Sequence, residues 1–193
     1  MYIRTKTRTN KSNNTYAYAY LAQIRRKKSR PKQKILKYLG RIYIAQKIGT
    51  KQPEITLDSP LRDIFSSLLK TELENHGFKE TVPLSLRNWD LEVNLGNITV
   101  SNLKTGKKVC IQLNQGILCE ETLKNLVEYS IPQENLKGIR QHFAKTIVEA
   151  GIQAPETVMV QIFQKIQTMI NTKQCQTMPN NAKHTRKDIK KSV

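Results

Sequence analysis

Residues 15–26 read TYAYAYLAQIRR, a run in which the side chains alternate with a period of two. One face of the run carries Tyr16, Tyr18, Tyr20, Ala22 and Ile24. The opposite face carries the smaller and more polar set Ala17, Ala19, Leu21, Gln23 and Arg25. Successive side chains of a β-strand point to opposite faces, so this alternation predicts a strand.

Two further strands are predicted beside this one. Residues 2–9 alternate in the same way and place Tyr2, Arg4, Lys6 and Arg8 on one face. The segment 10–14 between the two runs contains three asparagines and predicts a turn, because Asn tolerates left-handed backbone angles.

A third strand is expected over Lys32–Leu39, after the charged turn Arg25–Pro31, and Gly40 is expected to end it. Simple alternation puts Ile35 and Leu39 on one face and Lys34, Leu36 and Tyr38 on the other. The N-terminal part is therefore predicted to be a basic three-stranded antiparallel meander. A sheet this small needs to pack on the rest of the chain.

The remainder of the sequence predicts an α+β fold. Apolar residues at helical spacing indicate a helix that begins at Pro60, is capped by Asp58 or Ser59, and ends at Gly77. Short strands are expected over 90–95, 97–102 and 109–113, forming a short antiparallel sheet. Three C-terminal helices are expected over 118–129, 130–151 and 155–170.

Four segments follow from these patterns. We expect a basic β-meander arm over 1–46, a linker over 47–57, a globular α+β domain over 58–170 and a basic tail over 171–193. The tail is rich in Lys, Asn and Gln and has no apolar periodicity, which predicts disorder.

The charge of the chain is strongly segregated. The net charge is +18, and residues 1–53 contain 15 Lys or Arg and no acidic residue. Residues 54–170 carry 12 basic and 14 acidic residues, which is close to neutral. Inert surfaces usually mix the two signs, whereas a cationic segment gains affinity for a polyphosphate by releasing its counterions. The arm therefore indicates a nucleic-acid partner.

Six of the seven tyrosines lie within the first 43 residues, among these cations. A tyrosine ring can stack on a base, and the planar guanidinium of Arg matches a phosphate or a guanine edge. The candidate nucleic-acid-binding residues are Arg4, Lys6, Arg8, Tyr18, Arg25, Arg26, Lys27, Lys28, Arg30, Lys32, Lys34 and Arg41.

One question about the central strand stays open at this point. Either the face with Tyr16, Tyr18 and Tyr20 packs on the protein, or it faces solvent. If the tyrosines are buried, the small opposite face would let a phosphate backbone approach closely.

The sequence offers no catalytic residue, metal site or cofactor motif. Four acidic residues fit helix starts, where they favour the positive end of the dipole: Asp58, Asp63, Glu120 and Glu121. Asp90 and Glu92 are expected on one solvated face of a strand. We therefore expect no enzymatic activity.

The cellular context is inferred from what the ends and the cysteines lack. Cys110, Cys119 and Cys175 show no metal-ligand spacing and indicate reduced thiols, the first two of them in the core. No signal peptide precedes the basic N-terminus, and no apolar run reaches the roughly 20 residues of a membrane span. We expect a cytoplasmic protein, with nucleoid association as an option and no membrane partner.

Residues 1–42 resemble the N-terminal segment of DDE-type insertion-sequence transposases. In that family a short strand, here Tyr2-Ile3-Arg4, precedes a second strand, a basic turn and a strand that ends in a Leu-Gly-Arg-like sequence. The match here is Lys37-Tyr38-Leu39-Gly40-Arg41.

The resemblance covers about a fifth of the chain and implies a DNA-binding arm without the transposase chemistry. The central region is too short for an RNase H-like core with insertions, and it contains no Asp-Asp-Glu constellation. The rest of the chain is similar in style to small basic proteins of archaea and their mobile elements.

The function expected from the sequence is non-catalytic nucleic-acid binding through the arm, in a mobile-element context. DNA is preferred over RNA because of the transposase-like arm. Three alternatives remain: an RNA- or ribosome-associated protein, a small metal-dependent nuclease or recombination factor, and a protein–protein adaptor that uses the near-neutral helical half. The sequence does not indicate an oligomeric state.

Overall fold

The computed structural model describes residues 1–27, 30–131 and 136–176, and these residues form an α+β fold of nine strands and four helices. The strands are β1 (Tyr2–Thr9), β2 (Thr15–Lys27), β3 (Arg30–Ile44), β4 (Lys79–Val82), β5 (Ser85–Asn88), β6 (Leu91–Asn94), β7 (Thr99–Asn102), β8 (Lys107–Leu113) and β9 (Gly116–Leu118). The helices are α1 (Leu61–Asn75), α2 (Glu120–Val127), α3 (Leu136–Glu149) and α4 (Glu156–Gln176). The predicted α+β class is confirmed.

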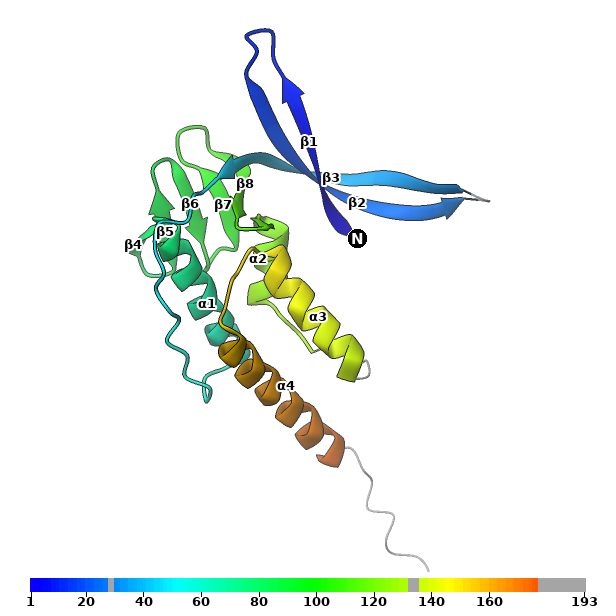
Figure 1. Cartoon of the computed structure of the whole chain (residues 1–193), viewed down its shortest axis with the longest axis vertical. Coiled ribbons are helices and arrows are strands. Elements are labelled where there is room, and N and C mark those ends of the chain that lie inside the picture. The colour runs from blue at the N-terminus through cyan, green and yellow to red at the C-terminus, as the bar shows by residue number, and fades with distance from the viewer. Residues whose placement is uncertain (28–29, 132–135, 177–193) are drawn as a thin grey trace, which may run out of the picture.

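The three N-terminal strands form the predicted antiparallel meander. β1 pairs with β2 from Tyr2 opposite Ala22 to Thr9 opposite Thr15, and β2 pairs with β3 over 18–27. Only the middle of β2 therefore has a neighbour on both sides. Beyond it the sheet divides into two ribbons that diverge from a common crossing point (Figure 1).

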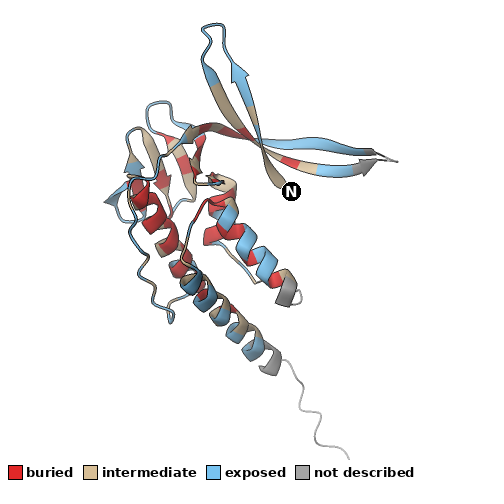
Figure 2. Cartoon of the chain, viewed as in Figure 1, coloured by how far each residue is buried: buried red, intermediate tan, exposed pale blue. Residues whose placement is uncertain are grey.

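We call the β1–β2 hairpin, closed by Asn10–Asn14, the first ribbon. The outer part of the β2–β3 hairpin, over 23–34, is the second ribbon. Both project away from the globular body, and their outer parts are largely exposed (Figure 2). The first ribbon turns at Asn13, which adopts a φ of 58° as expected for a left-handed Asn in a turn.

The prediction that Gly40 ends the third strand was wrong. β3 continues to Ile44 and pairs in parallel with β8, from Arg41 beside Val109 to Ile44 beside Gln112. The arm and the body therefore share one mixed sheet in the order β1-β2-β3-β8-β7-β6-β5-β4, with β9 also paired to β8.

Gly40 permits this junction instead of closing the strand. Its φ is +142°, and a Cβ atom there would lie 2.8 Å from the carbonyl oxygen of Lys108 and 2.8 Å from the Cα of Val109. Only glycine combines that backbone angle with so close an approach of two backbones.

Two bulges change the faces of β3. The pairing of β2 with β3 shifts register between Ala19 and Tyr20 and again between Leu21 and Ala22. Each shift adds one residue to β3, so Ile35 comes to lie on the same face as Tyr38, not on the opposite face as expected. A period-two pattern cannot show such an insertion.

The helices lie on one side of the sheet in the body (Figure 1). The core is formed by apolar side chains of β5–β9 packed against all four helices, with Phe65, Leu69, Leu86, Ile111 and Leu123 fully buried. Strands β4, β5 and β9 were not expected from the sequence. None of the described helices is long and apolar enough to cross a membrane.

Two helix ends differ from expectation. Pro60 is the N-cap of α1, and neither Asp58 nor Ser59 caps the helix with its side chain. α4 continues to Gln176, six residues beyond the expected end at 170. The expected disordered tail otherwise lies outside the described residues.

The linker lies along α1. Residues 45–60 form no helix or strand, but the N–H groups of Ile48 and Gly49 donate to the carbonyl oxygen of Asn75 at 2.7 and 2.9 Å. The Asn75 side chain also accepts a hydrogen bond from the N–H of Lys51 at 2.7 Å. Hydrogen bonds therefore fix the linker against the C-terminal end of α1.

The buried carboxylate of Glu72 connects that linker to the rest of the body. It lies 3.3 Å from the Lys47 ammonium and 3.2 Å from Nε2 of His76. It also accepts hydrogen bonds from the side chain of Asn114 at 2.8 Å and the N–H of Gln153 at 3.1 Å. Three segments distant from α1 in sequence, at Lys47, Asn114 and Gln153, thus converge on one side chain.

We predict that Gly40→Ala destabilises the protein by about 1–3 kcal/mol, because the added Cβ atom would push β8 away and strain the backbone. Urea unfolding followed by circular dichroism measures the change. Gly106→Ala is the control: Gly106 also has a positive φ of 64°, but a Cβ atom there meets nothing within 4 Å. Equal losses in the two variants would contradict the role of the close approach.

Candidate nucleic-acid interface

The small face of β2 is the one that packs on the body. Ala19 is fully buried in a cluster with Leu39, Ile42, Cys110 and Cys119, and Ala17 and Leu21 pack at its edge. The hypothesis that this face receives a phosphate backbone is therefore wrong over 17–21. The tyrosines of β2 lie on the opposite face, which settles the question that the sequence left open.

The predicted core positions of Cys110 and Cys119 are confirmed, since both are buried. A hydrogen bond between the two thiols, together with burial, raises the pKa of Cys110. The same bond lowers the pKa of Cys119 to about 6, and contacts with Thr122 at the start of α2 act in the same direction. This pair anchors the arm at the junction of β8 and α2.

We call the side chains of Tyr16, Tyr18, Tyr20, Tyr38 and Tyr43 the tyrosine face. The ring of Tyr38 lies 5.4 Å from that of Tyr20 and 6.3 Å from that of Tyr18, measured between centroids. Tyr38 is 54% exposed, and the other four rings are partly exposed. Partial burial, with smaller contributions from Tyr18 and Tyr20, raises the pKa of Tyr38.

The guanidinium of Arg41 lies over two of these rings. Its guanidinium carbon lies 4.1 Å from the centroid of Tyr16 and 5.0 Å from the centroid of Tyr43. Stacking occupies the faces of the guanidinium and leaves the N–H groups at its edge, in a fork that fits phosphate. The Arg41 side chain makes no hydrogen bond or ion pair with the residues that the structure describes. The two rings therefore orient the Arg41 guanidinium, while its N–H donors have no partner among these residues.

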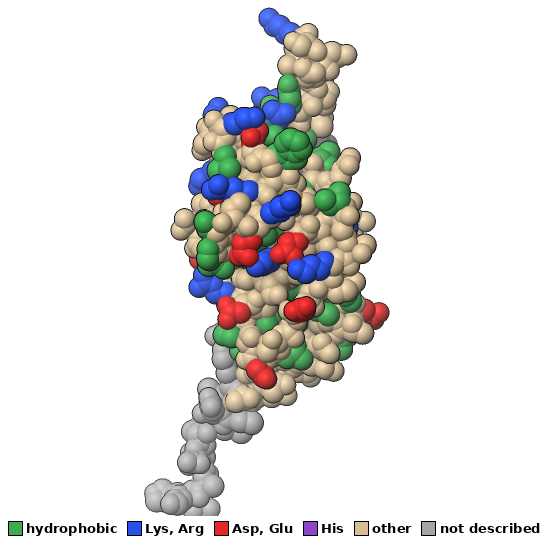
Figure 3. Space-filling model, turned by 90° about the vertical axis from the view of Figure 1, so that its left-hand side faces the viewer, with side chains coloured by type: hydrophobic (Ala, Val, Ile, Leu, Met, Phe, Trp, Pro, Cys, Tyr) green, Lys and Arg blue, Asp and Glu red, His purple; other side chains and the backbone are tan. Residues whose placement is uncertain are grey.

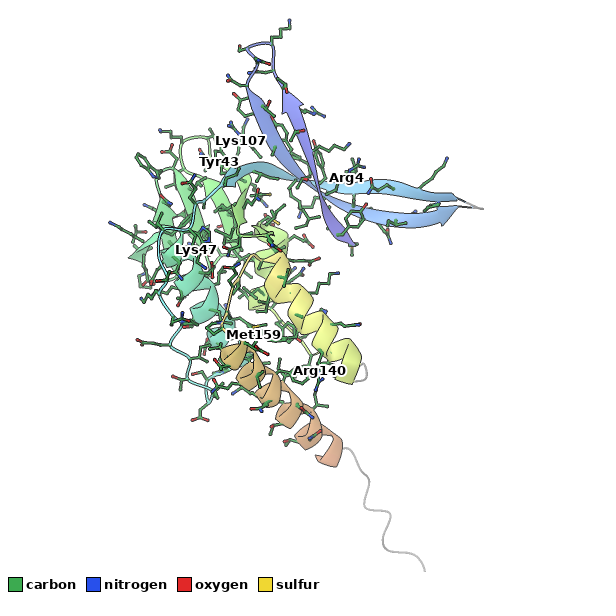
Figure 4. All side chains as sticks on the ribbon, viewed as in Figure 1. Arg4, Tyr43, Lys47, Lys107, Arg140 and Met159 are labelled. Atoms are coloured by element: carbon green, nitrogen blue, oxygen red, sulfur yellow. The ribbon has the colours of Figure 1, made fainter. Side chains whose placement is uncertain are left out.

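Three cations of β1 lie on the same side of the sheet. In the β1–β2 register, Arg4, Lys6 and Arg8 stand opposite Tyr20, Tyr18 and Tyr16. The Lys6 ammonium lies 5.6 Å from the centroid of Tyr20, and Arg4, labelled at the strand crossing in Figure 4, donates to the side chain of Gln33. The structure thus brings together five predicted residues: Arg4, Lys6, Arg8, Tyr18 and Arg41.

The cations of the second ribbon lie on the other face. Arg25 pairs with Lys32, and Gln23 pairs with Lys34, which places Arg25, Lys32 and Lys34 on the face of Ala19 but beyond the body. All three are exposed. The backbones of Arg26, Lys27 and Arg30 belong to this ribbon, but their side chains, and the whole of Lys28, lie outside what the structure describes.

Four of the six carboxylates named from the sequence, Asp90, Glu92, Glu120 and Glu121, are paired with cations. Asp63 lies in the first turn of α1, and Glu120 and Glu121 lie in the first turn of α2, as expected. The placement of Asp90 on a strand was wrong, because it belongs to the turn between β5 and β6. Among the described residues, no three His, Cys, Asp or Glu side chains are grouped so that they could hold a metal ion.

The surface of the body differs from that of the arm. Acidic and basic side chains alternate over the face shown in Figure 3. Lys37, near the base of the arm, is partly neutralised by Glu121 at 3.6 Å, and Lys108 pairs with Glu120, whose pKa this contact lowers. The described cations of the two ribbons, by contrast, form no ion pair with a described acidic residue.

Two aromatic residues with a place in this region were not predicted from the sequence. Tyr43 lies beyond the expected third strand, because the sequence pattern ends that strand at Gly40. Trp89 lies in the turn between β5 and β6 and is 94% exposed. An aromatic residue flanked by Asn88 and Asp90 was a signal for such a turn, but the two strands around it were not expected.

Comparisons of the chain with protein-family models, with curated proteins and with solved structures find no match. The function is therefore inferred from the geometry of the arm and of the body next to it.

One ion pair of the body gives a pH-dependent prediction. Glu92 accepts a hydrogen bond from Nε of Arg87 at 2.9 Å and one from the hydroxyl of Ser85 at 2.9 Å, and these bonds hold its pKa below the ordinary 4.5. A carboxyl group whose pKa is lowered by folding stabilises the protein above its unfolded pKa. That contribution is lost as the pH falls through the folded value.

We predict that Glu92→Gln costs about 1 kcal/mol at pH 7, and that the variant and the wild type become equally stable at pH values well below 4.5. Urea unfolding at a series of values between about pH 3 and about pH 7 measures both curves. Glu128→Gln is the control, since Glu128 forms only an exposed contact at 3.9 Å with Lys124. Parallel curves for wild type and Glu92→Gln would contradict the assignment.

Proposed function

We propose that this protein binds nucleic acid through its N-terminal arm, without catalysis, and that DNA is the preferred partner. The observation that carries the proposal is Arg41, whose guanidinium lies over the rings of Tyr16 and Tyr43 and whose N–H donors have no partner among the described residues. Arg4, Lys6 and Arg8 extend the same face along β1. A prearranged guanidinium loses little conformational freedom when it binds a phosphate, so such a position favours binding of a polyanion.

The shape of the arm supports contact with a nucleic-acid backbone. Two-stranded β-ribbons can enter a groove or follow a strand. Each of the two ribbons carries cations, on opposite faces of the sheet, and both extend past the body. Phosphates contacted on both ribbons would give an affinity dominated by counterion release.

The preference for DNA rests on the resemblance of residues 1–42 to the N-terminal segment of insertion-sequence transposases. A second candidate, an RNA-associated protein, is favoured by the exposure of the tyrosine face. Aromatic rings accessible to solvent can stack on unpaired bases, which occur in RNA loops and in single strands.

The remaining alternatives receive less support from the geometry. A metal-dependent nuclease needs carboxylates that converge on an ion. The six named from the sequence form no group of three that could hold a metal ion among the described residues, and Glu92 and Glu120 are engaged by Arg87 and Lys108. A protein adaptor that uses the near-neutral helical half would not need the unpaired cations of the arm.

Binding to duplex DNA should be dominated by phosphates. If about six cations contact phosphates, log K should fall against log salt with a slope near −5. Changing Arg4, Lys6 and Arg8 together to Ser should reduce that slope by about 3, or about 0.9 for each phosphate that is no longer neutralised. Fluorescence anisotropy with a labelled duplex, titrated at several salt concentrations, measures the slope.

The control for this experiment is the triple change of Lys104, Lys124 and Lys145 to Ser, which removes the same charge from the body. It should leave the slope unchanged. Salt-independent binding by the wild type, or an equal effect of the two triple variants, would show that the arm is not the contact surface.

Tyr18→Ala separates the two nucleic-acid candidates. If Tyr18 stacks on bases, the affinity for a single strand should fall by about 1–3 kcal/mol with the salt slope unchanged. Thr7→Ala, on the opposite face of the first ribbon, is the control and should bind like the wild type. An unchanged single-strand affinity in Tyr18→Ala would remove the support for the RNA candidate.

A further inference from the structure

A cavity of 530 Å³ lies next to the tyrosine face. It is bounded by the end of β3, the C-terminal end of α1, the turn between β5 and β6, and β7. Tyr43, labelled in Figure 4 where β3 enters the body, lines this cavity and also stacks on Arg41. The cavity is therefore contiguous with the proposed phosphate-binding surface.

Trp89 forms part of the cavity wall, and the fold buries almost none of its side chain. It is the only tryptophan of the chain and is 94% exposed. It is the first residue of a two-residue turn between Asn88 and Leu91, with a φ of 52°. Gly, Asn or Asp usually occupy such a position, because larger side chains are strained there. A strained and unburied indole suggests that its role is contact with a ligand.

The hairpin that carries Trp89 is itself well fixed. Arg87 and Glu92 face each other across its two strands and are joined at 2.8 Å. The side-chain amide of Asn88 donates to the carbonyl oxygen of His76 at 3.0 Å, which ties the turn to the end of α1. The indole is thus presented from a rigid support.

Polar groups of three kinds surround the cavity. Asn102 accepts hydrogen bonds from the N–H and the hydroxyl of Thr105 at 3.0 and 3.1 Å, which fixes its amide and leaves its Nδ2 without a partner among the described residues. The Asn88 Oδ1 is likewise unpartnered within the described part of the chain. Asp90 adds a carboxylate that is 2.9 Å from the Lys104 ammonium.

We propose that this cavity binds one unpaired nucleobase of the nucleic acid whose phosphates the arm holds. Trp89 and Tyr43 contact the faces of the base, Asn88, Asn102 and Asp90 hydrogen-bond its edge, and Arg41 binds an adjacent phosphate. The inference rests on the proposed function, and it names the substrate class: a strand that offers a base outside a double helix.

The cations beside the cavity favour this ligand over a protein segment. Ile44 and Ile48, at its rim, are 74% and 77% exposed and would also suit an apolar partner. However, Tyr43 of the cavity wall contacts Arg41, which also contacts Tyr16, the cross-strand partner of Arg8. A ligand that spans both the cavity and these cations must carry negative charge beside an aromatic group. A base that is paired has its hydrogen-bonding edge occupied and cannot enter a pocket, which is why the base must be unpaired.

Trp89 provides a direct signal, because no other tryptophan contributes to the fluorescence. The wild type is titrated with a fully paired duplex of about 20 base pairs, roughly two helical turns, with the same duplex containing one extrahelical adenine, and with free AMP. We expect the extrahelical adenine to quench Trp89 and to tighten binding about 5- to 100-fold relative to the paired duplex. AMP alone should quench only weakly.

Trp89→Gly is the decisive variant. Glycine suits a positive φ, so the variant should melt at the same temperature as the wild type or higher. It should bind the paired duplex with unchanged affinity and salt slope but lose the preference for the extrahelical base. Leu84→Gly is the matched control, because Leu84 is also exposed at a positive φ of 66° in a hairpin turn. It should keep the preference.

Each other result overturns a particular claim. If Trp89→Gly keeps the preference for the extrahelical base while the paired duplex still binds, the cavity is not a base site and the proposed function stands. If the wild type binds neither duplex, the proposed function fails. If AMP binds as tightly as the extrahelical base, the ligand is a free nucleotide. If Trp89→Gly changes the mass of the protein in solution, Trp89 joins protein chains and the base site is rejected.

Discussion

The contact of two backbones at Gly40 determines how the arm relates to the body. A Cβ atom at this position would lie 2.8 Å from backbone atoms of Lys108 and Val109, so no other residue lets β3 run alongside β8. The parallel pairing of residues 41–44 with 109–112 follows from that approach. Because of it, the arm is a continuation of the sheet of the body, and the orientation of its faces is inherited from β8. A flexible attachment would have left that orientation undefined.

This orientation explains why the tyrosines are available. Ile42 lies beside Cys110 on the side that meets Cys119 at the start of α2, so β2 packs on the body through that side, with Ala19 fully buried and Ala17 and Leu21 partly buried. The fully buried position is an alanine, whose small side chain packs against Leu39, Ile42 and the two cysteines. The tyrosines are thus turned toward solvent, and Arg41, one position before Ile42, points to their side. The stacked guanidinium is a consequence of the same register that buries Ala19.

The sequence predicted the elements that follow from local periodicity, but not the features that depend on close contact between two backbones. The strands of the arm, the helix over 61–75 and the faces of β1 and β2 follow from periodicity, since nothing in the fold opposes it. The bulges in β3 depend on its pairing with β2, and the pairing of β3 with β8 joins Arg41 to Val109, far apart in the sequence; no local pattern records either. The short strands β4 and β5 were not predicted, for a related reason. Their turns use Leu84 and Trp89 at positive φ, where turn chemistry leads one to expect Gly or Asn.

The candidate site was predictable in composition but not in arrangement. The charge of the arm identified the ribbons, yet the split of its cations between two faces depends on the twist and register of the strands. Arg41 was named from the sequence as one candidate among twelve, and only its contacts with Tyr16 and Tyr43 distinguish it. Those contacts also join the arm to the cavity at Trp89, through the shared ring of Tyr43. A cationic ribbon alone attracts any polyanion, whereas a stacked arginine beside an aromatic pocket can distinguish a base from a phosphate, which is the step from attraction to recognition.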